Sequence, residues 1–306
     1  MSKMHIERSI HIKAPAHNIY KVISDFNDWR PWSPWLLMEP EARVKVAPDS
    51  KSYEWEGDRT GSGKMEILEE KENEFIDYDL NFLKPWKSHA NTNFTLSRER
   101  EGTKVTWRMD SSLPFFLFFM KKRMEAYVGA DYERGLDMLK VYVESGEVPS
   151  KLDFVGNNVF EGTRFIGIKT ACSIDTIDEQ MESDFEKVRK YAAEENIQMK
   201  EMMTIYHKWD IPKNKATYTA ALGLEKIPDN LPTEFISGTI PNAECYVLKH
   251  TGRYQYLGNA WSTLYTMMRN KEIKHNKKID PFEVYLNYPQ STEKKDPETE
   301  IYLPVR

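Results

Sequence analysis

Two short segments near the end of the chain each place a carboxylate two residues before a phenol. Glu283 and Tyr285 form the first pair, and Glu300 and Tyr302 form the second. Residues two apart share one face of a β-strand, so each pair would hold an acid beside an aromatic ring. Ring faces and carboxylates both attract positive charge, and the pattern therefore favours a cationic or polarised organic ligand. An ordinary surface hairpin with the same alternation is the alternative.

Apolar residues alternate with these acids and phenols over 282–286 and 301–305. They would form the opposite face of the same two strands. If this aliphatic face packs on helices, both acid–phenol pairs point away from the helices. Such a face must be solvated or hold a ligand, because a buried carboxylate needs partners.

The composition of the 306 residues excludes several classes of protein. The net charge is -5, and without a long basic block the chain lacks a nucleic-acid footprint. The only cysteines, Cys172 and Cys245, exclude a disulfide framework and a cysteine-based zinc site. No His, Asp or Glu pair has metal-ligand spacing, so we expect neither metal nor cofactor. The longest apolar run, Leu113 to Met120, is too short to span a bilayer, and we expect a cytoplasmic protein without a membrane partner.

The first half of the chain predicts one curved antiparallel sheet closed by a long helix. Residues 6–12 alternate like a strand, a short helix and a Trp-rich loop follow, and six strand-like runs lie between residues 42 and 111. Apolar residues at helical spacing then extend from Phe116 to Val143. Gly146 and Pro149 follow that helix, where a domain linker belongs, so we predict domains over 1–147 and 152–306.

This order of elements resembles the SRPBCC superfamily, the START-like helix-grip fold of the polyketide cyclase and dehydrase type. The segments that carry the resemblance are 14–16, 32–35, 61–65 and 102–107. The resemblance implies a deep apolar cavity between the sheet and the long helix. The histidines of this half have no partner at an interpretable spacing, so catalysis there is not expected. Five tryptophans are expected in the core or the cavity lining: Trp32, Trp35, Trp55, Trp86 and Trp107.

The second half repeats one pattern of strand, helix, strand and strand. The first copy covers 163–173, 177–195, 202–209 and 216–222, and the second covers 244–250, 254–270, 282–287 and 300–305. Two such units predict a curved sheet with both helices on one face and a groove on the other. The candidates to line the groove are Tyr206, Tyr218, Glu283, Tyr285, Glu300 and Tyr302.

This half resembles the GyrI-like family, the effector-binding domain of AraC-type and MerR-type transcription activators. The resemblance is carried by residues 249–254, by Trp261, and by residues 282–287 and 300–305. It implies a pocket glutamate among aromatic rings that holds cationic or amphipathic drugs and, in some members, hydrolyses reactive small molecules. By position Glu283 is the pocket glutamate and Glu300 the second candidate, and Trp261 joins the candidate ligand-binding residues.

We therefore expect a two-domain α+β protein that binds a hydrophobic or cationic small molecule, as a sensor or a sequestering protein. No basic recognition helix is visible, so direct contact with nucleic acid is not expected. A separate DNA-binding partner protein and a homodimer are open alternatives. The rival hypothesis is an enzyme, either a hydrolase in which Glu283 activates water or one whose chemistry lies in the N-terminal cavity.

Overall fold

The computed structural model describes residues 2–113, 115–148, 150–287 and 296–306. The chain divides into two units, Met1–Lys151 and Leu152–Arg306, and each unit contains one sheet. Both sheets are antiparallel and carry helices, so the predicted α+β class is confirmed. Within the described ranges, no helix is both long and apolar enough to cross a membrane.

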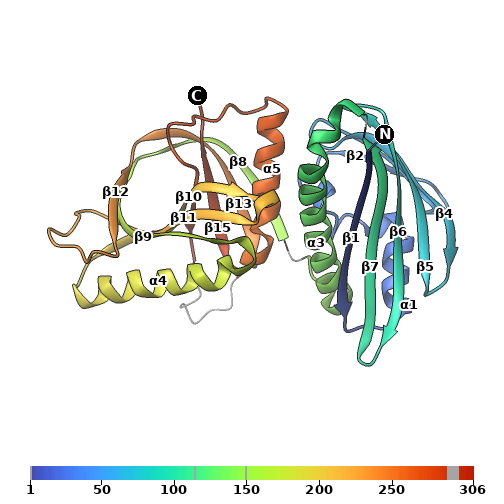
Figure 1. Ribbon diagram of the computed structural model, residues 1–306, viewed down its shortest axis with the longest axis horizontal. Helices are drawn as coiled ribbons and strands as arrows, with labels where there is room; N and C mark the ends of the chain where they lie inside the picture. Colours follow the sequence, from blue (N-terminus) through green and yellow to red (C-terminus); the bar gives the residue numbers. More distant parts are fainter. Residues whose placement is uncertain (1, 114, 149, 288–295) are drawn as a thin grey trace. The chain divides into compact units, whose positions relative to one another are not determined.

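Unit 1 is a seven-stranded antiparallel sheet with a 25-residue helix, α3, packed on it. The strand order is β1-β7-β6-β5-β4-β3-β2, and α3 runs beside β1 and β7 (Figure 1). This is the predicted helix-grip arrangement. Its elements are β1 (Ser2–Ile12), α1 (Ala16–Ser24), η1 (Phe26–Asp28), α2 (Pro34–Leu37), β2 (Arg43–Val46), β3 (Ser52–Gly57), β4 (Gly61–Lys71), β5 (Phe75–Lys84), β6 (Ser88–Glu99), β7 (Gly102–Leu113), η2 (Phe115–Met120) and α3 (Lys121–Ser145).

Aromatic rings occupy the space between this sheet and α3. Trp107 of β7 stacks on Tyr132 of α3 with ring centroids 3.9 Å apart, and on Phe94 of β6 at 4.7 Å. Trp32 meets Trp107 edge to face, with ring centroids 5.9 Å apart, and is fully buried. Rings therefore fill much of the region where the resemblance implied a deep cavity. Trp86 departs from the expectation, because it lies in the turn between β5 and β6 and is 51% exposed.

Unit 2 is an eight-stranded sheet in the order β12-β9-β11-β10-β14-β15-β13-β8. Helix α4 packs on β9 and β11, and α5 packs on β13 and β15. The two copies meet at the antiparallel pair β10–β14, near the middle of the sheet. The elements are β8 (Ser150–Phe160), β9 (Thr163–Ser173), η3 (Ile174–Thr176), α4 (Ile177–Glu194), β10 (Met199–Asp210), η4 (Ile211–Lys213), β11 (Lys215–Leu224), β12 (Ile236–Ile240), β13 (Ala243–Gly252), η5 (Tyr254–Tyr256), α5 (Leu257–Arg269), β14 (Phe282–Tyr285) and β15 (Glu298–Pro304).

Each copy has one more strand than the sequence pattern predicted. β8 precedes the first copy but lies beside β13 of the second copy, and β12 precedes the second copy but pairs with β9 of the first. Each extra strand thus extends the other copy's half of the sheet. This exchange ties the two copies together, because neither half of the sheet is complete without a strand from the other.

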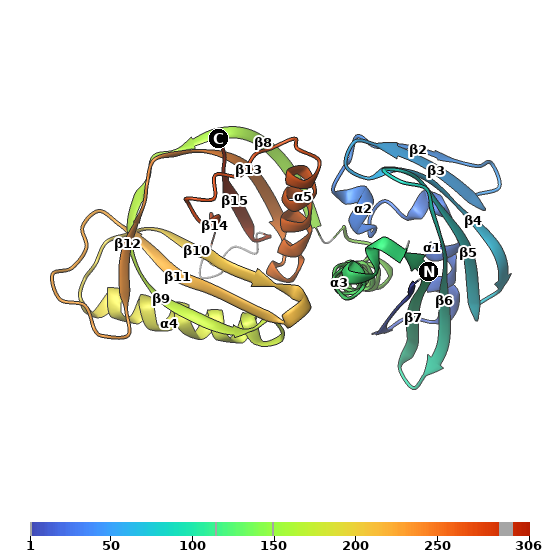
Figure 2. The ribbon, with the colours of Figure 1, turned by 45° about the horizontal axis from the view of Figure 1, so that its top comes forward.

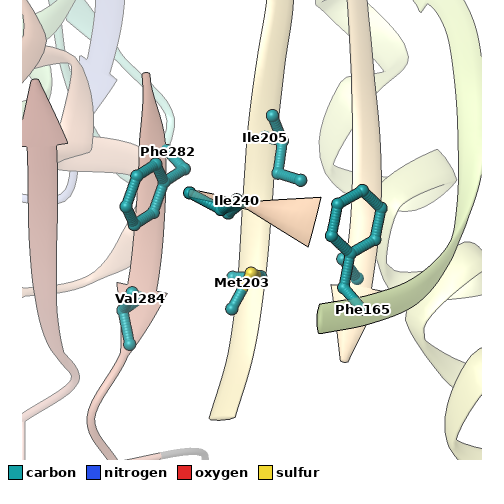
Figure 3. Packing of buried hydrophobic residues seen from close by; sticks show 7 residues of the cluster. Phe165, Met203, Ile205, Ile240, Phe282 and Val284 are labelled. Carbon is teal, nitrogen blue, oxygen red and sulfur yellow. The ribbon is translucent and has the colours of Figure 1, made fainter. Parts of the chain in front are cut away.

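The aliphatic face of β14 packs against the sheet itself and not against helices. Phe282 and Val284 join Met203, Phe165 and Ile240 in one cluster, to which β9, β10, β12 and β14 contribute (Figure 3). Phe160 of β8 also reaches Phe282, with ring centroids 4.7 Å apart. Since strands from both ends of the order meet in this cluster, the sheet curls on itself, as Figure 2 shows. The expected arrangement of the two faces is therefore wrong: curling covers the aliphatic face, and the other face lies under the helices.

Candidate functional site

Glu283 lies at the centre of a cage of aromatic donors. The indole N–H of Trp261 donates to Oε1 of Glu283 at 2.5 Å. The hydroxyls of Tyr206 and Tyr285 both donate to Oε2, at 3.0 and 2.9 Å. The carboxylate is 1% exposed, and within the described ranges no Lys, Arg or His forms an ion pair with it. A buried acid is thus held by three neutral groups.

Three elements from both copies position these groups. Glu283 and Tyr285 are two apart on β14 and share its helix-side face. Thr204 of β10 stands directly opposite Glu283 in the ladder, and Tyr206 follows two residues later on the same face. Trp261 comes from α5, whose buried stripe of Leu257, Ala260, Leu264 and Met267 fixes the helix on the sheet. The site therefore forms where the two copies meet.

Helix α4 supplies the remaining wall of the site. Met181 accepts from the hydroxyl of Thr204 at 3.4 Å and lies 3.7 Å from that of Tyr285. The ring of Phe185, one turn later, meets the ring of Tyr285 at 5.7 Å. Asp178 precedes Met181 by three residues, so it lies on the same stripe of the helix, at its exposed N-terminal end.

Burial dominates the electrostatics of the site. Burial raises the pKa of the Glu283 carboxyl, the three donors oppose that shift, and the nearby charge of Asp178 raises the pKa further. Burial also raises the pKa of Tyr206 and Tyr285 well above the ordinary value, and the negative charge of Glu283 adds to both shifts. Both phenols consequently keep their protons and act as donors.

Aromatic side chains separate Glu283 from the solvent. Trp261 and Tyr206 are half-buried and meet with ring centroids 5.1 Å apart. Trp209 and Tyr265 continue this cover outward, at 5.7 Å from Tyr206 and 6.1 Å from Trp261, and are 36% and 45% exposed. A ligand that reaches the carboxylate must displace one of these rings.

The structure brings together four of the seven candidate residues, namely Glu283, Tyr285, Tyr206 and Trp261. Tyr218 shares their face of the sheet, but its hydroxyl donates to Asp184 of α4 at 2.8 Å, and its side chain is fully buried. It therefore belongs to a neighbouring buried cluster and not to the carboxylate cage.

Glu300 and Tyr302 lie on the opposite face, which corrects the expectation of one shared groove. In the β14–β15 ladder, Glu283 pairs with Ile301 and Phe282 pairs with Tyr302. Directly paired residues share a face, so this register separates the two acid–phenol pairs. Tyr302 stacks on Phe282 at 5.1 Å and donates to Glu300 at 2.6 Å.

Sequence reasoning missed Thr204 of β10 and the residues that α4 and η5 contribute to the site. Thr204 bonds the hydroxyl of Tyr285 at 2.8 Å, and the ring of Tyr254 packs on Tyr285 at 5.5 Å. Met181 and Phe185 lie four residues apart on α4, at the spacing of one apolar helix face. The apolar face of α4 packs on the sheet. With Glu283 placed on the helix side of the sheet, that face would have indicated Met181 and Phe185 as neighbours of the site.

The groups around Glu283 differ from those of a metal site. Within the described ranges, no group of three His, Cys, Asp or Glu side chains could hold a metal. The carboxylate among three aromatic side chains instead offers a single negative charge and several π faces. The carboxylate has about four acceptor positions and uses three for donors, so it could also orient one water molecule.

Two protein-family models match the chain. Residues 3–144 match polyketide cyclase / dehydrase and lipid transport, and residues 158–306 match the GyrI-like small molecule binding domain. No curated protein matches. Both parts of the chain are therefore of small-molecule-binding types.

Several solved structures are similar to parts of the chain. A protein from Mesorhizobium loti is 14% identical over 47% of this chain and 98% of its own, with a TM-score of 0.37. A protein from Chromobacterium violaceum is 19% identical over 46% and 96%, with a TM-score of 0.35. The EcmrR protein, in a DNA complex, is 15% identical over 62% and 69%, with a TM-score of 0.42.

Proposed function

Because the chain joins an SRPBCC-type domain to a GyrI-like domain, we propose that its second unit binds a hydrophobic or amphipathic organic cation at Glu283. The protein would act as a sensor or a sequestering protein for such compounds. The observation that carries the proposal is a carboxylate, 1% exposed, that three neutral side-chain donors hold.

A comparison with a second buried acid supports a ligand role. Glu39 in unit 1 accepts backbone N–H groups of Asp58, Arg59 and Thr60 at 2.6, 3.1 and 2.8 Å. Burial alone would raise its pKa, but these bonds and the Thr60 hydroxyl hold the pKa of Glu39 below its ordinary value. Backbone donors cannot turn away, which is typical of a structural anchor. Every donor to Glu283 is instead a side chain that can rotate, and the pKa of Glu283 is raised.

A cation would relieve the raised pKa of Glu283. Burial disfavours the charged carboxylate, and an opposite charge within a few ångströms favours it again. Displacement of Trp261 would open the carboxylate to the ligand and leave the rings of Tyr206 and Tyr285 against the ligand's apolar groups. The proposal therefore predicts competition between a proton and the cation for the same carboxylate.

The test compares the wild type with Glu283→Gln, using tetraphenylphosphonium as the cation and triphenylphosphine oxide as the neutral control. A ligand at about 100 times its Kd stabilises the folded state by about 2.7 kcal/mol. We expect the cation alone to raise the melting temperature of the wild type, and the variant to respond to neither compound. An equal response of both proteins to the cation would contradict the role of Glu283.

The rival function, hydrolysis, rests on the same carboxylate. A partly desolvated acid with a raised pKa suits a general base that takes a proton from water. The comparison is product formation from a panel of epoxides and activated esters by the wild type and by Glu283→Gln. Turnover that the variant lacks would establish the hydrolase, whereas equal rates would remove it and leave the binding proposal intact.

A further inference from the structure

An exposed group of residues at the start of α3, the aromatic–basic patch, plays no part in the site at Glu283. It consists of Phe118 and Phe119 at the end of η2 with Lys122, Arg123 and Tyr127 of α3. The two phenylalanines are 66% and 70% exposed, and their rings meet edge to face at 6.1 Å. The two phenylalanines belong to the apolar run Leu113 to Met120, which is too short to span a bilayer.

Two features of this patch oppose folding stability. Phenylalanine is among the residues most often buried, yet two adjacent ones face the solvent here. The first turn of α3 also contains Lys121, Lys122 and Arg123 and no acid, which places cations at the positive end of the helix dipole. Residue types that reduce stability in this way are expected where a surface has a binding role.

The patch combines exposed aromatic rings with exposed positive charges. The guanidinium of Arg123 lies 5.5 Å from the ring centre of Tyr127, which is itself 38% exposed. Lys122 and Arg123 are exposed, whereas Lys121 is paired with Glu125 at 3.7 Å. Aromatic rings suit the boundary between headgroups and acyl chains, and exposed cations suit the negative surface of a membrane.

We propose that the aromatic–basic patch docks the protein on the surface of a bilayer that contains anionic lipids. Phe118 and Phe119 enter the boundary layer, and Lys122 and Arg123 contact lipid phosphates. A nucleic-acid duplex offers no apolar layer for two adjacent phenyl rings. The small size of the patch predicts reversible attachment that weakens with salt, because a Debye length of about 10 Å screens the cations at moderate ionic strength.

The test is flotation of the full chain with vesicles of phosphatidylcholine alone or with about one third phosphatidylserine. We expect the wild type to float only with the anionic vesicles and to dissociate in high salt. Phe118→Ser with Phe119→Ser should reduce binding at least about tenfold, and Lys122→Glu with Arg123→Glu about fivefold or more per residue. Circular dichroism establishes that each variant is folded.

The control variant is Leu68→Ser. Leu68 is 60% exposed on β4, but its neighbours Glu66 and Glu69 give it acidic surroundings, so its loss should leave vesicle binding unchanged. Failure of the wild type to bind anionic vesicles at low salt would overturn the proposal, as would equal binding to neutral vesicles. A dimer in sedimentation velocity that the double serine variant dissociates would also overturn it, by assigning the patch to a second copy of the chain.

Discussion

Replacement of Trp261 by Phe tests whether the carboxylate cage has been assigned correctly. Burial raises the pKa of Glu283, and the indole N–H of Trp261 is the donor that opposes this shift most. Trp261→Phe removes the N–H but keeps a ring against Tyr206. A hydrogen bond to a charged group contributes about 1.5–3 kcal/mol. We therefore expect the variant to lose about 2 kcal/mol of unfolding free energy at neutral pH.

Trp209→Phe is the matched control for this change. The ring of Trp209 also packs on Tyr206, at 5.7 Å, but it makes no hydrogen bond to Glu283. It is more exposed than the indole of Trp261, so its truncation should change the unfolding free energy by no more than about 0.5 kcal/mol. The difference between the two variants isolates the contribution of the hydrogen bond.

The assay is equilibrium unfolding in urea over a range of pH, combined with infrared detection of the protonated carboxyl. Loss of the Trp261 donor raises the pKa of Glu283 further, since that bond favours the charged form. An acid with a raised folded pKa takes up its proton in the folded state, so the deficit of Trp261→Phe should shrink as the pH falls through that pKa. Equal losses in both tryptophan variants, or a deficit independent of pH, would refute the assignment.

Three further predictions concern other charges of the chain. Asp178→Asn removes an acid that raises the pKa of Glu283, so calorimetry should show a lower pH midpoint for cation binding and about two- to fivefold weaker affinity at neutral pH; unchanged affinity would exclude Asp178 from the site. Glu39→Gln should lower the unfolding free energy by about 2–4 kcal/mol. Hydrogen bonds outweigh burial and lower the folded pKa of Glu39, so only the wild type should lose this contribution as the pH falls through that pKa. Burial lowers the pKa of His250 to about 4, so stability should fall by about 3 kcal/mol between about pH 6.5 and pH 4, and an imidazole resonance that titrates near its ordinary pKa would contradict this.

The alternation of residues in the second half predicted the two faces of β14 but could not orient them. Glu283 and Tyr285 do share a face, opposite Phe282 and Val284. Which face the helices cover depends on how far the sheet curls, and that depends on contacts such as Phe160 with Phe282, across 122 positions of sequence. From the sequence we consider helices on the aliphatic face, whereas the curled sheet buries that face against itself.

Register and edge strands were the other features that sequence alone could not provide. A shift of one residue between β14 and β15 would have placed Tyr302 beside Glu283, and nothing in the strand residues decides between the two registers. β8 contains Gly156 and two asparagines, and β12 contains Gly238, which are typical of turns and linkers. The backbone pairing of these strands with the other copy overrides that local preference.

The duplication itself explains why the site is asymmetric. Thr204 of the first copy stands directly opposite Glu283 of the second in the central ladder, and Tyr206 and Tyr285 both reach the same carboxylate oxygen. A second acid at position 204 would place two like charges side by side in a buried region, which is strongly unfavourable. Only one copy can therefore supply the carboxylate, while the other supplies the Tyr206 hydroxyl that donates to it and the Thr204 hydroxyl that bonds Tyr285. A repeated fold thus carries a single charge at its centre. Which copy supplies that charge follows from the residues of each strand and not from the duplication.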